Sequence, residues 1–187
     1  MSIVPAPVIS PQDLLRLSSE GGVEFVDGQV VEKPTSIESS EIEVAIIMLL
    51  SIEAHRTGAA WVFGASLGYQ VYPEDPRKFR KPDVSLVRSE RLAGVDVTQD
   101  FMLIPADLVV EVLSPYDLAY DVAEKVDEYL HYGFGLVWIV HPNIRSVAIY
   151  RPDGTTALLR EQDEITGEAA LPTFRCKVAE FFGKRPS

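Results

Sequence analysis

Apolar residues follow two patterns along this chain. Some form short continuous runs, which are typical of buried strands, and others recur every three to four positions, which is typical of helices. Short runs rich in valine, isoleucine and aromatic residues predict buried strands, at 60–63, 67–72, 82–87, 107–113 and 136–140. Two more strands are expected at 146–150 and 155–159, on either side of Asp153-Gly154. Apolar residues three to four positions apart predict helices with apolar bodies over 42–52 and 117–130.

A β-hairpin is expected near the N-terminus. Two apolar runs, 23–26 and 29–32, flank Asp27-Gly28, the dipeptide that favours a tight hairpin turn. Their alternation is imperfect, so one face of the hairpin should be only half buried. The long helix that follows opens at 35–41, with Ser36 or Ser39 as its candidate N-cap.

The stretch 105–125 carries the most informative conjunction in the sequence. Glu111 interrupts the apolar strand 107–113, and glutamate is almost never fully buried unless it is paired or binds a metal. The next helix carries Lys125, which lies within one to two turns of the helix start. A second carboxylate, Asp83, lies near the start of the strand 82–87. We therefore expect these three side chains to converge at one end of the sheet.

Two carboxylates and a lysine support two interpretations. Mg²⁺ binds to one or two carboxylates while it keeps waters and substrate phosphates, and such an ion can generate a hydroxide and stabilise a phosphodiester transition state. In that case Asp83 and Glu111 hold the ion, and Lys125 orients water or neutralises charge. Alternatively, the three residues form a buried structural salt bridge. The residues alone favour neither interpretation.

Composition limits the class of protein. The chain has 187 residues, which suits a single domain over 1–187. No apolar run approaches the ~20 residues that span a bilayer, and the N-terminus lacks the features of a secretory signal. One cysteine, Cys176, excludes an internal disulfide, so we expect a cytoplasmic protein without a membrane anchor. The net charge of -11 repels nucleic acid unless a basic patch or bound divalent cations offset it.

One basic patch interrupts this acidic chain. The loop 73–81 places Arg77, Lys78, Arg80 and Lys81 around Phe79. These cations either pair with nearby acids or form an edge that contacts substrate phosphates beside Asp83.

The long helix carries further candidates. Its first turns hold Glu38, Glu41 and Glu43, which suit the helix dipole. Among these we single out Glu38 as a residue of the metal site. The body 42–52 is apolar on most faces, so the helix is central or packs on a second subunit. We accordingly expect a homodimer or a larger symmetric oligomer.

Several motifs together resemble one known family. The segments KPDVSLV, DLVVEVLSPYDLAYDVAEKVDEYL, VWIV and VAIYR look like the Uma-type family of bacterial restriction-endonuclease-like proteins, within the PD-(D/E)XK nuclease superfamily. The resemblance implies an α/β fold with a restriction-endonuclease-like core, in which a mixed β-sheet is flanked by helices. It also implies cleavage of DNA phosphodiester bonds with Mg²⁺, for which Mn²⁺ can substitute. Asp83 then matches the PD motif, Glu111 the second acid, and Glu38 the acid of the first core helix.

The chain departs from the superfamily pattern at Leu113, where a lysine is expected two residues after Glu111. In this family the lysine has moved to the following helix, and Lys125 fits that place. The metal ligands implied are Asp83, Glu111 and the main-chain carbonyl of Val112. Two functions follow as hypotheses. The first is a Mg²⁺-dependent endonuclease; the second is a catalytically silent protein of the same fold that binds nucleic acid or assembles with other proteins.

Overall fold

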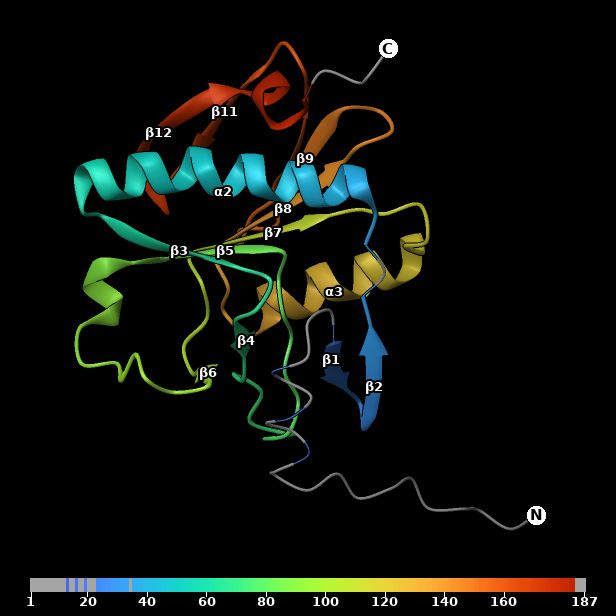
Figure 1. Cartoon of the computed structure of the whole chain (residues 1–187), viewed down its shortest axis with the longest axis vertical. Coiled ribbons are helices and arrows are strands. Elements are labelled where there is room, and N and C mark those ends of the chain that lie inside the picture. The colour runs from blue at the N-terminus through green and yellow to red at the C-terminus, as the bar shows by residue number, and fades with distance from the viewer. Residues whose placement is uncertain (1–12, 14–15, 17–18, 20–22, 34, 184–187) are drawn as a thin grey trace.

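A six-stranded sheet forms the centre of the protein (Figure 1). The computed structural model describes residues 13, 16, 19, 23–33 and 35–183. The strands lie in the order β10-β9-β8-β7-β5-β3, with the bounds β3 Ala60–Gly64, β5 Val84–Arg88, β7 Leu108–Val112, β8 Leu136–His141, β9 Ser146–Tyr150 and β10 Thr156–Arg160. Neighbours are antiparallel except for the parallel pair β7 and β8. The predicted mixed sheet and α/β fold are therefore confirmed.

Two long helices cover opposite faces of this sheet, as Figure 1 shows. Helix α2 (Ile37–Thr57) packs on the face that carries Leu108, Val110 and Val112 of β7. Helix α3 (Ala119–His131) packs on the other face, which carries Val109 of β7. Because side chains alternate along a strand, Glu111 points to the α3 side. Each fully buried aliphatic side chain stabilises this arrangement by about 1.5–3 kcal/mol.

The start of α2 has a specific cause in the sequence. The Ser36 hydroxyl accepts a hydrogen bond from the Ser39 backbone N–H, and the Ser39 hydroxyl accepts one from Ser36 N–H, a reciprocal capping box. Ser36 is thus the N-cap, as one of the two predicted candidates. Gly58 ends the helix with a φ of 67°, in the left-handed region that glycine tolerates best.

The N-terminal hairpin is present as predicted, formed by β1 (Val23–Val26) and β2 (Gln29–Glu32). All four residues of β1 are buried and all four of β2 are exposed. A backbone bridge between Phe25 and Phe79 joins the hairpin to the loop 73–81. The hairpin lies on the α3 side of the sheet, and the chain continues from β2 to α2 (Figure 1).

Several small elements differ from expectation or were not predicted. The strand expected at 67–72 is reduced to β4 (Gly68–Tyr69), which pairs in parallel with β6 (Phe101–Met102). A hairpin of β11 (Glu164–Gly167) and β12 (Leu171–Lys177) packs near α2, and its apolar positions are too sparse to signal strands. By contrast, the short helices that the sequence predicts at 89–92 and around 178–182 are present as the 3₁₀ helices η1 (Ser89–Leu92) and η2 (Val178–Phe181). Among the described residues, no helix combines the length and apolar character needed to cross a membrane.

Candidate active site

Strand pairing places two carboxylates side by side. Val84 of β5 lies opposite Val110 of β7 in an antiparallel register. Continuing that register by one residue brings Asp83 beside Glu111. Asp83 is 7% exposed and Glu111 is 5% exposed, so both acids are buried within the protein. A buried carboxylate needs partners, and the surrounding elements supply them.

Each carboxylate is held on one side by a neutral donor. The Val112 backbone N–H donates to Asp83 Oδ2 over 2.7 Å. The Tyr129 hydroxyl of α3 donates to Glu111 Oε1 over 2.6 Å, and the tyrosine side chain is fully buried. These bonds fix both side chains and leave one oxygen of each acid, Asp83 Oδ1 and Glu111 Oε2, to face a common point.

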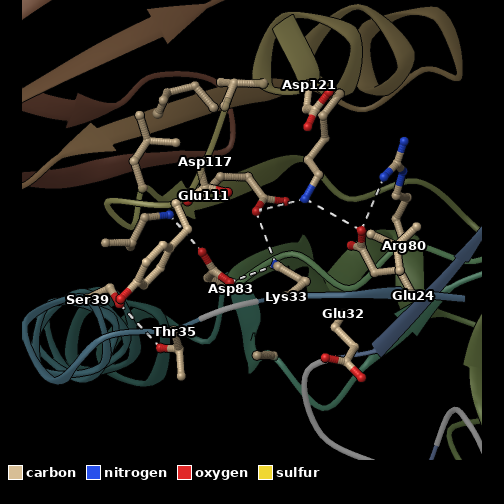
Figure 2. Close-up of a pocket in the computed structure, with 18 of the residues that line it drawn as sticks. Glu24, Glu32, Lys33, Thr35, Ser39, Arg80, Asp83, Glu111, Asp117 and Asp121 are labelled. Carbon is tan, nitrogen blue, oxygen red and sulfur yellow. Dashed lines mark hydrogen bonds and ion pairs between the residues drawn. The ribbon is translucent and has the colours of Figure 1, made fainter. Parts of the chain in front are cut away.

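A lysine that sequence reasoning missed lies at that point. The Lys33 ammonium contacts Asp83 Oδ1 at 2.7 Å and Glu111 Oε2 at 3.1 Å. It also donates to the Lys81 carbonyl over 2.7 Å. Figure 2 shows Lys33 between the two acids, with a dashed line to each. Lys33 directly follows β2, so the position of the hairpin determines where this ammonium lies.

Lys125 reaches the same site from α3. Its ammonium lies 3.4 Å from Glu111 Oε2 and 3.5 Å from Glu24 Oε2. Glu24, on β1, is completely buried and also pairs with Arg80 and the Lys81 backbone N–H. The structure thus brings Asp83, Glu111 and Lys125 together, and adds a third acid behind them.

Burial and the neighbouring charges set the pKa values of these acids. Burial raises the pKa of Glu111, but the ammonium groups of Lys125 and Lys33 outweigh it, so the pKa lies below its usual range. Asp83 has one ammonium neighbour, and burial together with Glu111 raises its pKa above the usual value. For Glu24, the cations Lys125, Lys33 and Arg80 overcome burial and lower the pKa to about 2. Glu111 and Glu24 are therefore ionised at neutral pH.

The acids open onto one cavity of about 590 Å³. Eight carboxylates and three cations line it: Glu24, Glu32, Glu43, Asp83, Glu111, Asp117, Asp121, Glu124, Lys33, Arg80 and Lys125. This excess of negative charge favours a bound cation and opposes an isolated phosphate.

On α2, Glu43 rather than Glu38 lines the cavity. Glu38 is exposed in the first turn of the helix, whereas Glu43 lies more than one turn further along. Burial raises the pKa of Glu43 to about 7, and the carboxylates of Asp83 and Glu111 contribute in the same direction. Glu38 and Glu43 lie on different faces of α2, because residues five positions apart in a helix of about 3.6 residues per turn point in different directions.

The cations of the loop 73–81 interact with other groups of the protein. Arg77 pairs with Asp75, and Lys78 pairs with Glu128 and Asp27. Arg80 pairs with Glu24 and Glu128, and among the four only Arg80 lines the cavity. Lys81 is 1% exposed, with its ammonium over the Phe79 ring. Contact with a phosphate would require these cations to exchange partners, and Arg77, whose side chain is 47% exposed, is the most accessible.

The donor set can hold a divalent ion. Within the described part of the chain, no group of three or more His, Cys, Asp or Glu side chains forms a metal-binding cluster. Mg²⁺ does not require one, because it binds to one or two carboxylates and completes its octahedron with water and substrate oxygens. The convergence of Asp83 Oδ1 and Glu111 Oε2 on the Lys33 ammonium marks a position where both oxygens meet one positive charge.

Comparison with known proteins identifies the family of the chain. The profile of the Uma2 family, described as "Putative restriction endonuclease", matches residues 11–179. The chain belongs to the Uma2 family. Among solved structures, it resembles a protein from Anabaena variabilis ATCC 29413 described as a putative nuclease belonging to DUF820, with a TM-score of 0.79 and 19% identity. That match covers 94% of this chain and 98% of the other. No curated protein matches the chain.

Membership of Uma2 confirms the resemblance drawn from the motifs and supports a nuclease function. Sequence reasoning missed Lys33, Glu24 and Tyr129, and among the acids of the long helix it singled out Glu38, whereas Glu43 lines the cavity. A charged residue in a buried strand, as in VEFV, is a usable signal for Glu24. Nothing in the local sequence of Lys33 indicates that it meets Asp83, because the contact spans fifty positions.

Proposed function

We propose that this Uma2 protein is an endonuclease that hydrolyses DNA phosphodiester bonds with Mg²⁺, or with Mn²⁺ in its place. The observation that carries the proposal is the convergence of Asp83 Oδ1 and Glu111 Oε2 on one cationic position. Those two acids, with the Val112 carbonyl, would hold the ion. When bound, the ion lowers the pKa of its water and stabilises charge on the phosphate.

The chain's own residues supply positioning and electrostatics. The Val112 N–H and the Tyr129 hydroxyl orient the two acids, so that little rearrangement precedes binding. Lys125 lies beside Glu111 and offers the cation that Leu113 cannot, for stabilising negative charge that builds on the phosphate oxygens. The strand cation of the superfamily pattern is thus replaced by one from α3.

The decisive experiment is cleavage of plasmid DNA by purified protein with Mg²⁺ or Mn²⁺, compared with EDTA. We expect nicking or linearisation that Asp83→Asn and Glu111→Gln each abolish. Glu164→Gln serves as the control, because Glu164 is half exposed on β11 outside the cavity. Activity retained by both acid variants would point to a contaminating nuclease and contradict the proposal.

A second candidate is a protein of the same fold that binds nucleic acid or assembles without cutting. The observation in its favour is Lys33, whose ammonium already forms ion pairs with both acids. A wild-type protein that binds DNA equally with and without Mg²⁺, and cuts nothing with either metal, would support this candidate.

We also propose that the protein forms a homodimer or a larger symmetric oligomer through α2. Val44, Met48 and Ile52 are more than half exposed and lie four residues apart, along one stripe of the helix. Trp61 is half exposed on β3, the edge strand that contacts α2. Two related sites would suit cleavage of both strands of a duplex. Sedimentation should show a multimer that Met48→Glu dissociates, and a wild-type monomer at micromolar concentration would contradict this.

A further inference from the structure

The Lys33 ammonium uses its full bonding capacity at the site. An ammonium has three N–H donors, and Lys33 has three acceptors within reach: the Lys81 carbonyl, Asp83 and Glu111. Lys33 is therefore the residue that links the two acids through hydrogen bonds and ion pairs.

Lys33 also lies where a divalent ion would have to bind. The other oxygens of the pair are engaged, Asp83 Oδ2 by the Val112 N–H and Glu111 Oε1 by the Tyr129 hydroxyl. Only Asp83 Oδ1 and Glu111 Oε2 face a common point, and Lys33 occupies it. Mg²⁺ binds carboxylate oxygens at about 2.0–2.1 Å, so an ion on both oxygens leaves no room for an ammonium between them. Two positive charges at this separation also repel each other.

The place of Lys33 in the chain allows it to leave. It follows β2, whose residues are all exposed, and precedes the start of α2. The cavity in front of it is lined by further acids, among them Glu32 and Glu43, which offer the ammonium other partners. By contrast, Lys125 lies within α3, and its ammonium contacts both Glu111 and Glu24.

We propose that Lys33 is a placeholder cation, a positioning residue that holds Asp83 and Glu111 ready for a divalent ion and leaves them when the ion binds. This inference rests on the proposed metal-dependent function. It assigns different tasks to the two lysines, since Lys33 organises the empty site and Lys125 remains beside Glu111 in the loaded one. The ion must displace an internal competitor, so the protein binds it more weakly than the bare carboxylate pair would.

The test is the affinity of the full-length protein for Mn²⁺, measured by titration calorimetry without DNA. Lys33→Met removes the competitor and keeps most of the side-chain volume. We expect the variant to bind Mn²⁺ at least tenfold more tightly than the wild type, and to melt at a lower temperature without metal. Because Asp83 and Glu111 then lose the Lys33 ammonium, added Mn²⁺ should raise the melting temperature of the variant more than that of the wild type. Arg151→Met is the control, since it breaks an ion pair with Glu168 outside the cavity.

The outcomes separate this inference from the function on which it rests. Equal or weaker Mn²⁺ binding by folded Lys33→Met, beside a wild type that binds, would overturn the placeholder role and leave the metal site standing. No Mn²⁺ binding by either folded protein would overturn both. Binding that follows the expected order without any DNA cleavage would support the placeholder and remove the proposed nuclease.

Crystals of the wild type with Mn²⁺ decide the question if Lys33→Met does not fold without metal. We expect anomalous scattering between Asp83 and Glu111, and a Lys33 ammonium beyond hydrogen-bond distance of both. An ammonium that still contacts the two acids, with Mn²⁺ bound elsewhere or absent, would overturn the proposal.

Discussion

Replacing Lys125 by methionine distinguishes a catalytic lysine from a structural one. The change keeps much of the volume of a side chain that is 17% exposed, and it removes the ammonium. Its pairs with Glu111 and Glu24, at 3.4 and 3.5 Å, are each worth about 5 kcal/mol of attraction at an effective dielectric constant of 20. Desolvation of the ions offsets most of this attraction.

Both acids keep other partners in the variant. Glu111 retains Lys33 and the Tyr129 hydroxyl, and Glu24 retains Arg80. We therefore expect a net loss of only about 1–2 kcal/mol, which lowers the melting temperature of a chain of this size by about 2–8 °C. Cleavage should fall by about 10²-fold or more, the usual cost of removing a group that stabilises the transition state.

The assay pairs thermal melts with single-turnover cleavage of supercoiled plasmid in Mg²⁺ and in Mn²⁺. Arg151→Met again serves as the control, because it loses an ion pair outside the cavity and should keep wild-type cleavage. A Lys125→Met variant that melts far lower yet cuts at the wild-type rate would show that Lys125 is only a structural partner of the acids.

Three further predictions follow. Tyr129→Phe removes the hydroxyl that orients Glu111, so calorimetry should show Mn²⁺ affinity reduced by about 10–100-fold with an unchanged circular dichroism spectrum; unchanged affinity would contradict the role. Because the pKa of Glu43 is raised from 4.5 to about 7, its charge costs stability increasingly as pH rises through that window. In urea titrations, Glu43→Gln should thus gain about 1–2 kcal/mol relative to wild type between pH 4.5 and 8, after allowance for solvent screening, and a constant difference would refute this. Arg77→Ala with Lys78→Ala should weaken DNA binding and lower its salt slope by about 2, whereas an unchanged slope would exclude phosphate contacts by this loop.

Local sequence determined the main elements and the pair of acids. The apolar runs predicted the strands of the central sheet because burial on both faces demands continuous hydrophobicity. Asp27-Gly28 and Ser36 predicted the hairpin and the N-cap, since both act through bonds within a few residues. A lone Glu111 in a buried strand required a partner, which directed attention to Asp83 and Lys125.

Tertiary structure alone decided which charges complete the site. Lys33 reaches Asp83 and Glu111 across fifty and seventy-eight positions, and Arg80 reaches Glu24 across fifty-six. No periodicity within one element encodes such contacts, because they depend on how the hairpin folds against the sheet. The same holds for the loop 73–81, whose charges allowed either pairing with nearby acids or a phosphate-binding edge, and packing shows carboxylate partners for Arg77, Lys78 and Arg80. The sequence could place an acid on a strand, but only the assembled fold could place a cation against it.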